Sequence, residues 1–194
     1  MNLQHPIENS AYYHIYNRGI NGCTIFFNDA NYKYFMKLYE KYIDPIADTY
    51  AWVLMGNHFH LLVRIKDEYE VKVTSVKPKK LYTYFSDLFN AYAQAINKTM
   101  GRTGSLFEHP FRRKIVTTDA YIQKLVCYIH HNPQKHGFID NYKDYPWSSY
   151  GTILSSKPTQ LKRECVIRWF DGIDNFIYSH EQRKDYDNEE WIIE

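Results

Sequence analysis

Two histidines separated by one residue, His58 and His60, have the side chains and the spacing of metal ligands. They open an apolar run over residues 58–65 that predicts a β-strand, and the alternation of side chains along a strand places both imidazoles on one face. Two imidazoles that converge from one face can hold a divalent metal ion. Taken alone, such a pair is more often two surface histidines. Its place directly after the tight-turn signal Gly56-Asn57 favours a site at the end of a sheet.

A tyrosine and an amide, Tyr128 and Asn132, form the second group that could do chemistry. Residues 119–131 carry apolar side chains at helical spacing, and Tyr121, Tyr128 and Asn132 fall along one border of that apolar stripe. Residues four apart are neighbours on a helix, so a phenol nucleophile could lie beside an amide ligand. Two imidazoles and an amide oxygen leave coordination positions for phosphate and water, which suits Mg²⁺ or Mn²⁺ better than zinc. Taken by themselves, both residues are more often ordinary packing residues.

The elements that must position these groups alternate between strands and helices. We expect strands over 11–18, 49–55, 58–65 and 106–117, and helices over 29–43, 80–100 and 119–131, the last ending at Asn132-Pro133. This order predicts an α+β fold: a ferredoxin-like (RRM-like) split βαβ sandwich with an antiparallel sheet and an added helix. Residues 1–150 form the main domain, and residues 151–194 a C-terminal helical extension packed on the core, with a helix over 160–170.

Composition and charge favour a nucleic-acid partner only weakly. The 194 residues include 19 Tyr and carry a net charge of +2, and most of these tyrosines fill the core in our interpretation. Short basic clusters can contact phosphate, but they are as often plain solvated surface. The basic residues that we consider for DNA contacts are Arg18, Lys77, Lys79, Lys80, Arg112, Arg113, Lys114 and Lys124.

From the cysteines, the N-terminus and the lack of long apolar runs we expect a cytoplasmic protein with no membrane partner. Cys23, Cys127 and Cys165 are far apart and form no CxxC pair, so we expect reduced thiols. The N-terminus lacks the basic and apolar regions of a signal peptide, and no apolar stretch approaches the length of a membrane span.

Four segments together resemble the single-tyrosine HUH transposases, and among them the REP-associated tyrosine transposases. They are YHIYNRG (13–19), AWVLMGNHFHLLV (51–63), GSLFEHPFRRK (104–114) and CYIHHNPQKHGFI (127–139), followed by YPWSSY. They occur in the family's order and spacing and cover about residues 11–150. A histidine pair or a YIxxNP segment alone would be weak, but the strand with HxH followed by YIxxNP on a later helix is specific.

The resemblance implies an active site on the open face of the sheet. The family's histidine ligands match His58 and His60, its third ligand matches Asn132, and its nucleophile matches Tyr128. Compact insertion-sequence members often have Gln at the position of Asn132, and their tails are shorter. Both differences favour the REP-associated branch.

The chemistry that follows is strand transfer on single-stranded DNA, with the unpaired strand next to a hairpin. The metal polarises the scissile phosphate, and Tyr128 attacks it to give a 5′-phosphotyrosine and a free 3′-OH. A phenol has an ordinary pKa near 10, so the metal, a cation such as Lys124, or water must activate it. One nucleophile holds one strand at a time, which is compatible with a monomer or a homodimer.

Two other functions are compatible with the same residues. One is a non-enzymatic RRM-like nucleic-acid-binding protein, although no RNP1 pattern is present and the histidine pair would have no purpose. The other is a metal-dependent nuclease in which water is the nucleophile and Tyr128 is structural. A covalent protein–DNA adduct separates all three.

Overall fold

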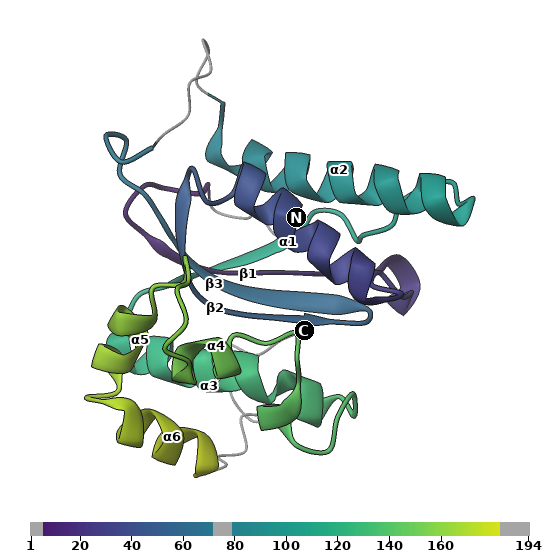
Figure 1. Ribbon diagram of the computed structural model, residues 1–194. Helices are drawn as coiled ribbons and strands as arrows, with labels where there is room; N and C mark the ends of the chain where they lie inside the picture. Colours follow the sequence, from purple (N-terminus) through teal and green to yellow (C-terminus); the bar gives the residue numbers. More distant parts are fainter. Residues whose placement is uncertain (1–5, 72–78, 183–194) are drawn as a thin grey trace.

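Four antiparallel strands form one open sheet in the computed structural model, which describes residues 6–71 and 79–182 (Figure 1). The sheet order is β2-β3-β1-β4. The strands are β1 (Tyr12–Arg18), β2 (Ala47–Met55), β3 (His58–Ile65) and β4 (Arg112–Val116). With the helices between them, the chain follows the predicted order β-α-β-β-α-β, and the α+β prediction is confirmed.

Helices cover both faces of the sheet (Figure 1). One face packs against α1 (Asp29–Tyr42) and α2 (Leu81–Met100), and the other against α3 (Asp119–Lys135). The alternation along β3 divides its apolar residues between these layers: Phe59 belongs to the first core and Leu62 to the second. The shorter elements are η1 (Ile20–Gly22), η2 (Tyr142–Asp144), α4 (Tyr150–Leu154), α5 (Arg163–Trp169) and α6 (Ile173–Glu181). Over the described ranges, no helix is long and apolar enough to cross a membrane.

The structure corrects the predicted end of α3. The helix contains Pro133 and continues to Lys135. A proline removes only its own N–H from the helical ladder, and the next turn is held by other donors. The N–H of His136 donates to the carbonyl of Asn132 (2.9 Å), and the N–H of Phe138 donates to that of Pro133 (2.8 Å).

The last strand is also shorter than predicted. The ladder with β1 includes only Arg112–Val116, although extended structure was expected from residue 106. Pro110 has no N–H to give to a ladder, and β4 lies at the edge of the sheet, as its proline predicted.

A chain of buried hydrogen bonds ties α6 to α3 and to the edge strand β2. His180 Nδ1 donates to the carbonyl of Phe176 (2.7 Å), so its Nε2 accepts from Nδ1 of His130 (2.8 Å). His130 Nε2 then accepts from the hydroxyl of Ser149 (2.8 Å), whose oxygen accepts the N–H of Trp52 (2.9 Å). Every group in this chain is satisfied only if both rings are neutral.

These two histidines predict a loss of stability in mild acid. Burial lowers the pKa of His180 to about 3 and that of His130 well below its ordinary value. An unfolded imidazole titrates near 6.5, so protons bind the unfolded chain more tightly. The stability from the neutral rings is therefore fully present above pH 6.5 and is lost as the pH falls toward 3.

Glutamine cannot titrate, so we expect His180→Gln to reduce the slope of the free energy of unfolding against pH by up to about 1.4 kcal/mol per pH unit. The measurement is urea unfolding of both proteins across this range. Equal slopes for the two proteins would contradict the assignment.

Candidate functional site

The hairpin of β2 and β3 brings the predicted histidine pair to one end of the sheet. A pocket of about 170 Å³ lies there, lined by His58, His60, Arg18 and Arg112 among others. The Oδ1 of Asn57 accepts from His58 Nδ1 (2.6 Å), so in a neutral His58 ring the lone pair lies on Nε2. The rings of His58 and His60 lie 5.4 Å apart, centroid to centroid.

Two buried atoms make no hydrogen bond with any described residue: Nε2 of His60, which lines this pocket, and Oδ1 of Asn132 on α3. His60 is 2% exposed and Asn132 is fully buried. The Nδ2 of Asn132 donates to the carbonyl of Tyr128 (3.0 Å), which leaves the oxygen for another partner. A buried polar atom without a partner costs free energy, and both atoms are of the kind that coordinates divalent ions.

Burial also keeps His60 neutral. It lowers the pKa of His60 well below 6.5, and the neighbouring His14, His58, His136 and Lys135 lower it further. A metal ligand must offer an unprotonated nitrogen, so this environment suits coordination.

The predicted nucleophile, Tyr128, lies behind this pocket rather than in it. Its side chain is 2% exposed, and its ring packs edge-on against His60 (5.5 Å between centroids) and His14 (6.2 Å). The ammonium of Lys135 lies 5.7 Å from the ring centroid. Tyr128 is not among the residues that line the pocket, so the structure brings it next to the histidines without exposing it to a substrate.

Sequence reasoning missed three residues at this site: His14, Lys135 and His136. His14 Nε2 lies 2.9 Å from His60 Nδ1, and His136 packs 4.8 Å from His58 between ring centroids. The signal for His14 was available, because it is the second residue of the YHIYNRG segment on a predicted strand. The sequence suggested Lys124 as the cation that activates Tyr128. Lys124 is exposed on α3, and the cation at the Tyr128 ring is Lys135.

The basic residues expected to contact DNA lie on both faces of the sheet. Arg112 and Lys114 pair with Tyr16 and His14 on β1, so their side chains share the face of His60. Arg113 points to the opposite face, where its guanidinium lies 5.5 Å from the ring of Phe111. Arg18 lines the pocket and lies 3.5 Å from the carboxylate of Glu108. Lys79 and Lys80 precede α2 in the layer on the other side, and Lys77 lies outside the described residues.

This division predicts which charges matter for DNA binding. Replacing Arg112 and Lys114 together by Gln should weaken the binding of a single strand and lower its salt slope by about 0.7 for each phosphate that is no longer neutralised. The matched change of Lys79 and Lys80 should have a smaller effect, because these residues precede α2, which packs on the other face of the sheet from His60. Titrations of a labelled strand at several salt concentrations measure both. A larger effect from Lys79 and Lys80 would contradict this division.

The described part of the chain contains no group of three or more His, Cys, Asp or Glu side chains placed to hold a metal ion. The predicted ligand set has only two imidazoles and completes them with an amide oxygen. The two buried atoms of His60 and Asn132 fit that set.

A known protein resembles this chain in sequence, and a solved structure resembles it in fold. No family model matches the chain. A Haemophilus influenzae protein, provisionally named a REP-associated tyrosine transposase, is 26% identical over 108 residues, which are 53% of this chain and 58% of that protein. The match thus spans less than two thirds of the relative. A solved structure of a REP-associated tyrosine transposase bound to a REP hairpin has a TM-score of 0.59 and 14% identity, covering 81% of this chain and 88% of the other.

Proposed function

We infer that this chain, a relative of the REP-associated tyrosine transposases in sequence and fold, cuts and rejoins single-stranded DNA through a covalent bond to Tyr128. The observation that carries this inference is the pair of buried atoms: His60 Nε2, whose ring packs against that of Tyr128, and Asn132 Oδ1, which lies one helical turn after Tyr128. They support a metal site next to the residue that we propose as the nucleophile.

In this proposal His58, His60 and Asn132 hold Mg²⁺ or Mn²⁺. The bound ion would polarise a phosphate oxygen of the substrate. His14 orients the ligand: if His60 Nδ1–H donates to His14 Nε2, the lone pair of His60 Nε2 is left for the ion.

Tyr128 supplies the nucleophile. Its phenol oxygen bonds to phosphorus as the bond from phosphorus to the 3′ oxygen breaks, and the phenol proton is lost while the leaving oxygen gains one. The products are a 5′-phosphotyrosine and a 3′-OH, which can later attack the phosphotyrosine and restore a phosphodiester. Lys135, next to the ring, is placed to attract a phosphate toward the tyrosine.

This chemistry requires a rearrangement of the site. Because Tyr128 is buried behind His60, its hydroxyl must enter the pocket before it can reach a phosphate. The second half of α3 and the residues that follow it are the segments whose displacement would achieve this.

The substrate that we propose is an unpaired strand next to a hairpin. The named structural relative is bound to a REP hairpin, and the face that carries Arg112 and Lys114 offers positive charge beside the pocket. A nuclease that uses water would need the same ion but would leave no protein on the DNA.

The test is covalent capture. We expect hairpin oligonucleotides with randomised single-stranded flanks to give a protein–DNA adduct that survives denaturing electrophoresis, in the presence of Mg²⁺ or Mn²⁺. The same sequences as blunt duplexes should give none, because a paired strand cannot reach a buried site. Cleavage without adduct would favour the water-using nuclease, and equal reaction of duplex and single strand would reject the proposal.

A further inference from the structure

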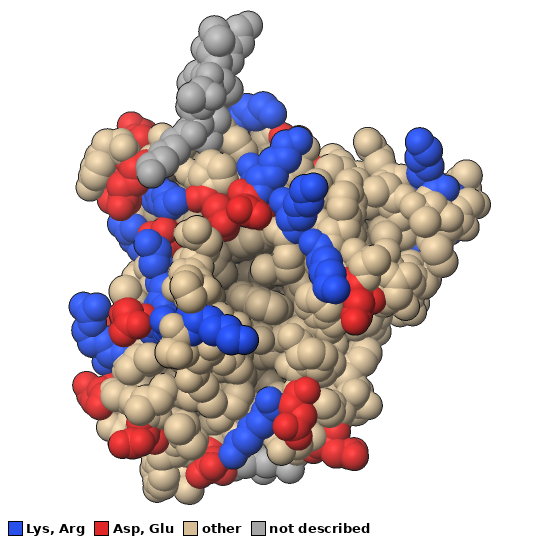
Figure 2. Space-filling view, in the orientation of Figure 1, with Lys and Arg blue, Asp and Glu red and all other residues tan. Residues whose placement is uncertain are grey.

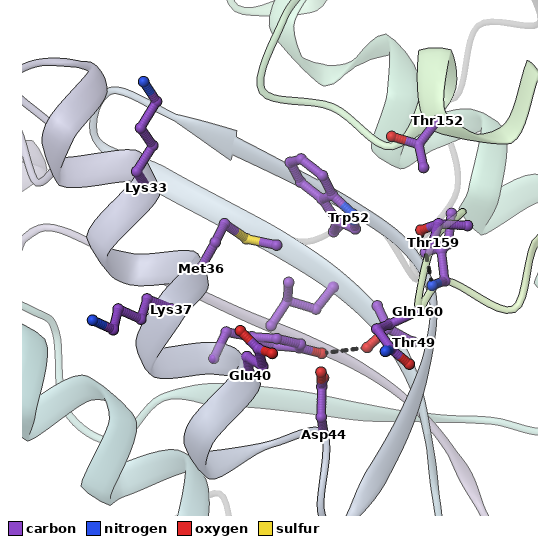
Figure 3. Close-up of a pocket in the computed structure, with 13 residues that line it drawn as sticks. Lys33, Met36, Lys37, Glu40, Asp44, Thr49, Trp52, Thr152, Thr159 and Gln160 are labelled. Carbon is purple, nitrogen blue, oxygen red and sulfur yellow. Dashed lines mark hydrogen bonds between the residues drawn. The ribbon is translucent and has the colours of Figure 1, made fainter. Parts of the chain in front are cut away.

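A second cavity, larger than the pocket at His60, lies on the other face of the sheet and takes no part in the proposed chemistry. It measures about 460 Å³, within the range of small-molecule sites. Its floor is Trp52 of β2 and Leu61 of β3, which pair directly in the ladder. Figure 2 shows this hollow on the face of Figure 1, and Figure 3 shows the residues around it.

Two separate parts of the chain build the cavity. One wall is α1, which contributes Met36 at the rim of the floor. The opposite wall is the segment between α4 and α5, where the N–H of Lys162 donates to the carbonyl of Thr49 (2.9 Å). The guanidinium of Arg163 donates to the carbonyls of Ser155 and Lys157, which fixes this wall.

The charges around the cavity are segregated. Lys33 and Lys37 are four residues apart on α1 and point outward at the rim (Figure 3). The carboxylates of Glu40 and Asp44 lie at one end (Figure 3). Figure 2 shows the same division, with a row of basic side chains along one rim and acidic ones at an end of the hollow.

We propose that this cavity binds one unpaired nucleotide of the DNA substrate, with its base on Trp52 and its phosphate at Lys33 and Lys37; this rests on the proposed function. An indole ring is a stacking platform for any base, and rim lysines attract the backbone. A phosphate is repelled from Asp44 and Glu40, so the base is the part that enters.

The acidic end selects the base. A carboxylate only accepts hydrogen bonds, so it favours bases with an exocyclic amino group. Guanine presents an imino and an amino hydrogen side by side, whereas thymine has no amino group. Burial raises the pKa of Asp44 to about 6, with Glu40 as the second cause, so above neutral pH its carboxyl is mainly an acceptor.

The test uses three five-nucleotide strands that differ only in the central position: guanine, thymine or an abasic sugar in a thymine background. Fluorescence anisotropy should give roughly tenfold tighter binding for guanine than for the abasic strand, with thymine between them. Asp44→Asn should remove the preference of guanine over thymine. Lys33→Ala with Lys37→Ala should weaken all three strands, whereas Lys98→Ala, an exposed lysine on α2, should change none.

Three outcomes would overturn the proposal. They are equal binding of the three strands, a guanine preference that survives Asp44→Asn, and binding of free dGMP as tight as that of the guanine strand, which would assign the cavity to a free nucleotide. Adduct formation at Tyr128 is measured separately on the same proteins. Loss of guanine preference in Asp44→Asn with unchanged adduct formation isolates this cavity, and wild-type protein without any adduct rejects the proposed function alone.

Discussion

Tyr128→Phe is expected to abolish the covalent protein–DNA adduct while the protein stays folded and binds DNA. The substitution removes only the phenol oxygen, which is the atom that would bond to phosphorus. The ring keeps its edge-on contacts with His60 and His14, so no cavity forms in the core. The free energy of unfolding should change by about 1 kcal/mol or less, the size of one hydrogen bond.

Tyr121→Phe is the matched control, because Tyr121 lies on the same helix seven residues earlier. Burial raises the pKa of Tyr121 to about 12, so its phenolate is harder to form than that of a free tyrosine. The residue one turn after it is Leu125, which cannot bind a metal, whereas Asn132 follows Tyr128. We therefore expect Tyr121→Phe to keep forming the adduct.

The measurement is denaturing electrophoresis of the hairpin reaction, followed by mass spectrometry of the linked peptide. An adduct in Tyr128→Phe, or one mapped to another tyrosine, would overturn the assignment. A Tyr128→Phe variant that also loses DNA binding would indicate a loss of fold, which circular dichroism would detect.

Local patterns predicted most of the elements because each has its own chemical signal. The turn at Gly56-Asn57 and the alternation after it predicted β3 with the bounds that the structure has, and the side chain of Asn28 caps the predicted helix α1. The end of α3 could not be read locally, because the turn after Pro133 is held by residues beyond it.

The site was predictable in its parts and not in its arrangement. Spacing indicated His58 and His60, whereas Tyr128 and Asn132 were chosen over ordinary packing residues because of the resemblance to the transposases. How these side chains lie relative to one another depends on how α3 packs on the sheet. The burial of Tyr128 and the contact of His14 with His60 follow from that packing and from the register of β1 on β3. The larger cavity depends on the segment between α4 and α5, which folds back across the edge of the sheet and has no local signature.

Metal removal is expected to stop cleavage and to leave DNA binding nearly intact. Chelation by EDTA and His60→Ala should both reduce adduct formation to background, since each removes the means of polarising the phosphate. Affinity for the hairpin should change little, because phosphate contacts at residues such as Arg112 supply most of it. His109→Ala, an exposed histidine outside the pocket lining, is the matched control and should react normally.

His14→Ala separates a ligand from the residue that orients it. Loss of such a neighbour typically weakens metal affinity by about 10–100-fold, so excess Mn²⁺ should restore cleavage in His14→Ala but not in His60→Ala. A second readout does not depend on activity: Mn²⁺ should raise the Tm of the wild-type protein, because binding to the folded state stabilises it, and should not raise that of His60→Ala. Full cleavage in EDTA, or the same Mn²⁺-induced rise in His60→Ala, would exclude the metal site. Rescue of both variants by Mn²⁺ would show instead that His60 is not a ligand and that the buried nitrogen has another role.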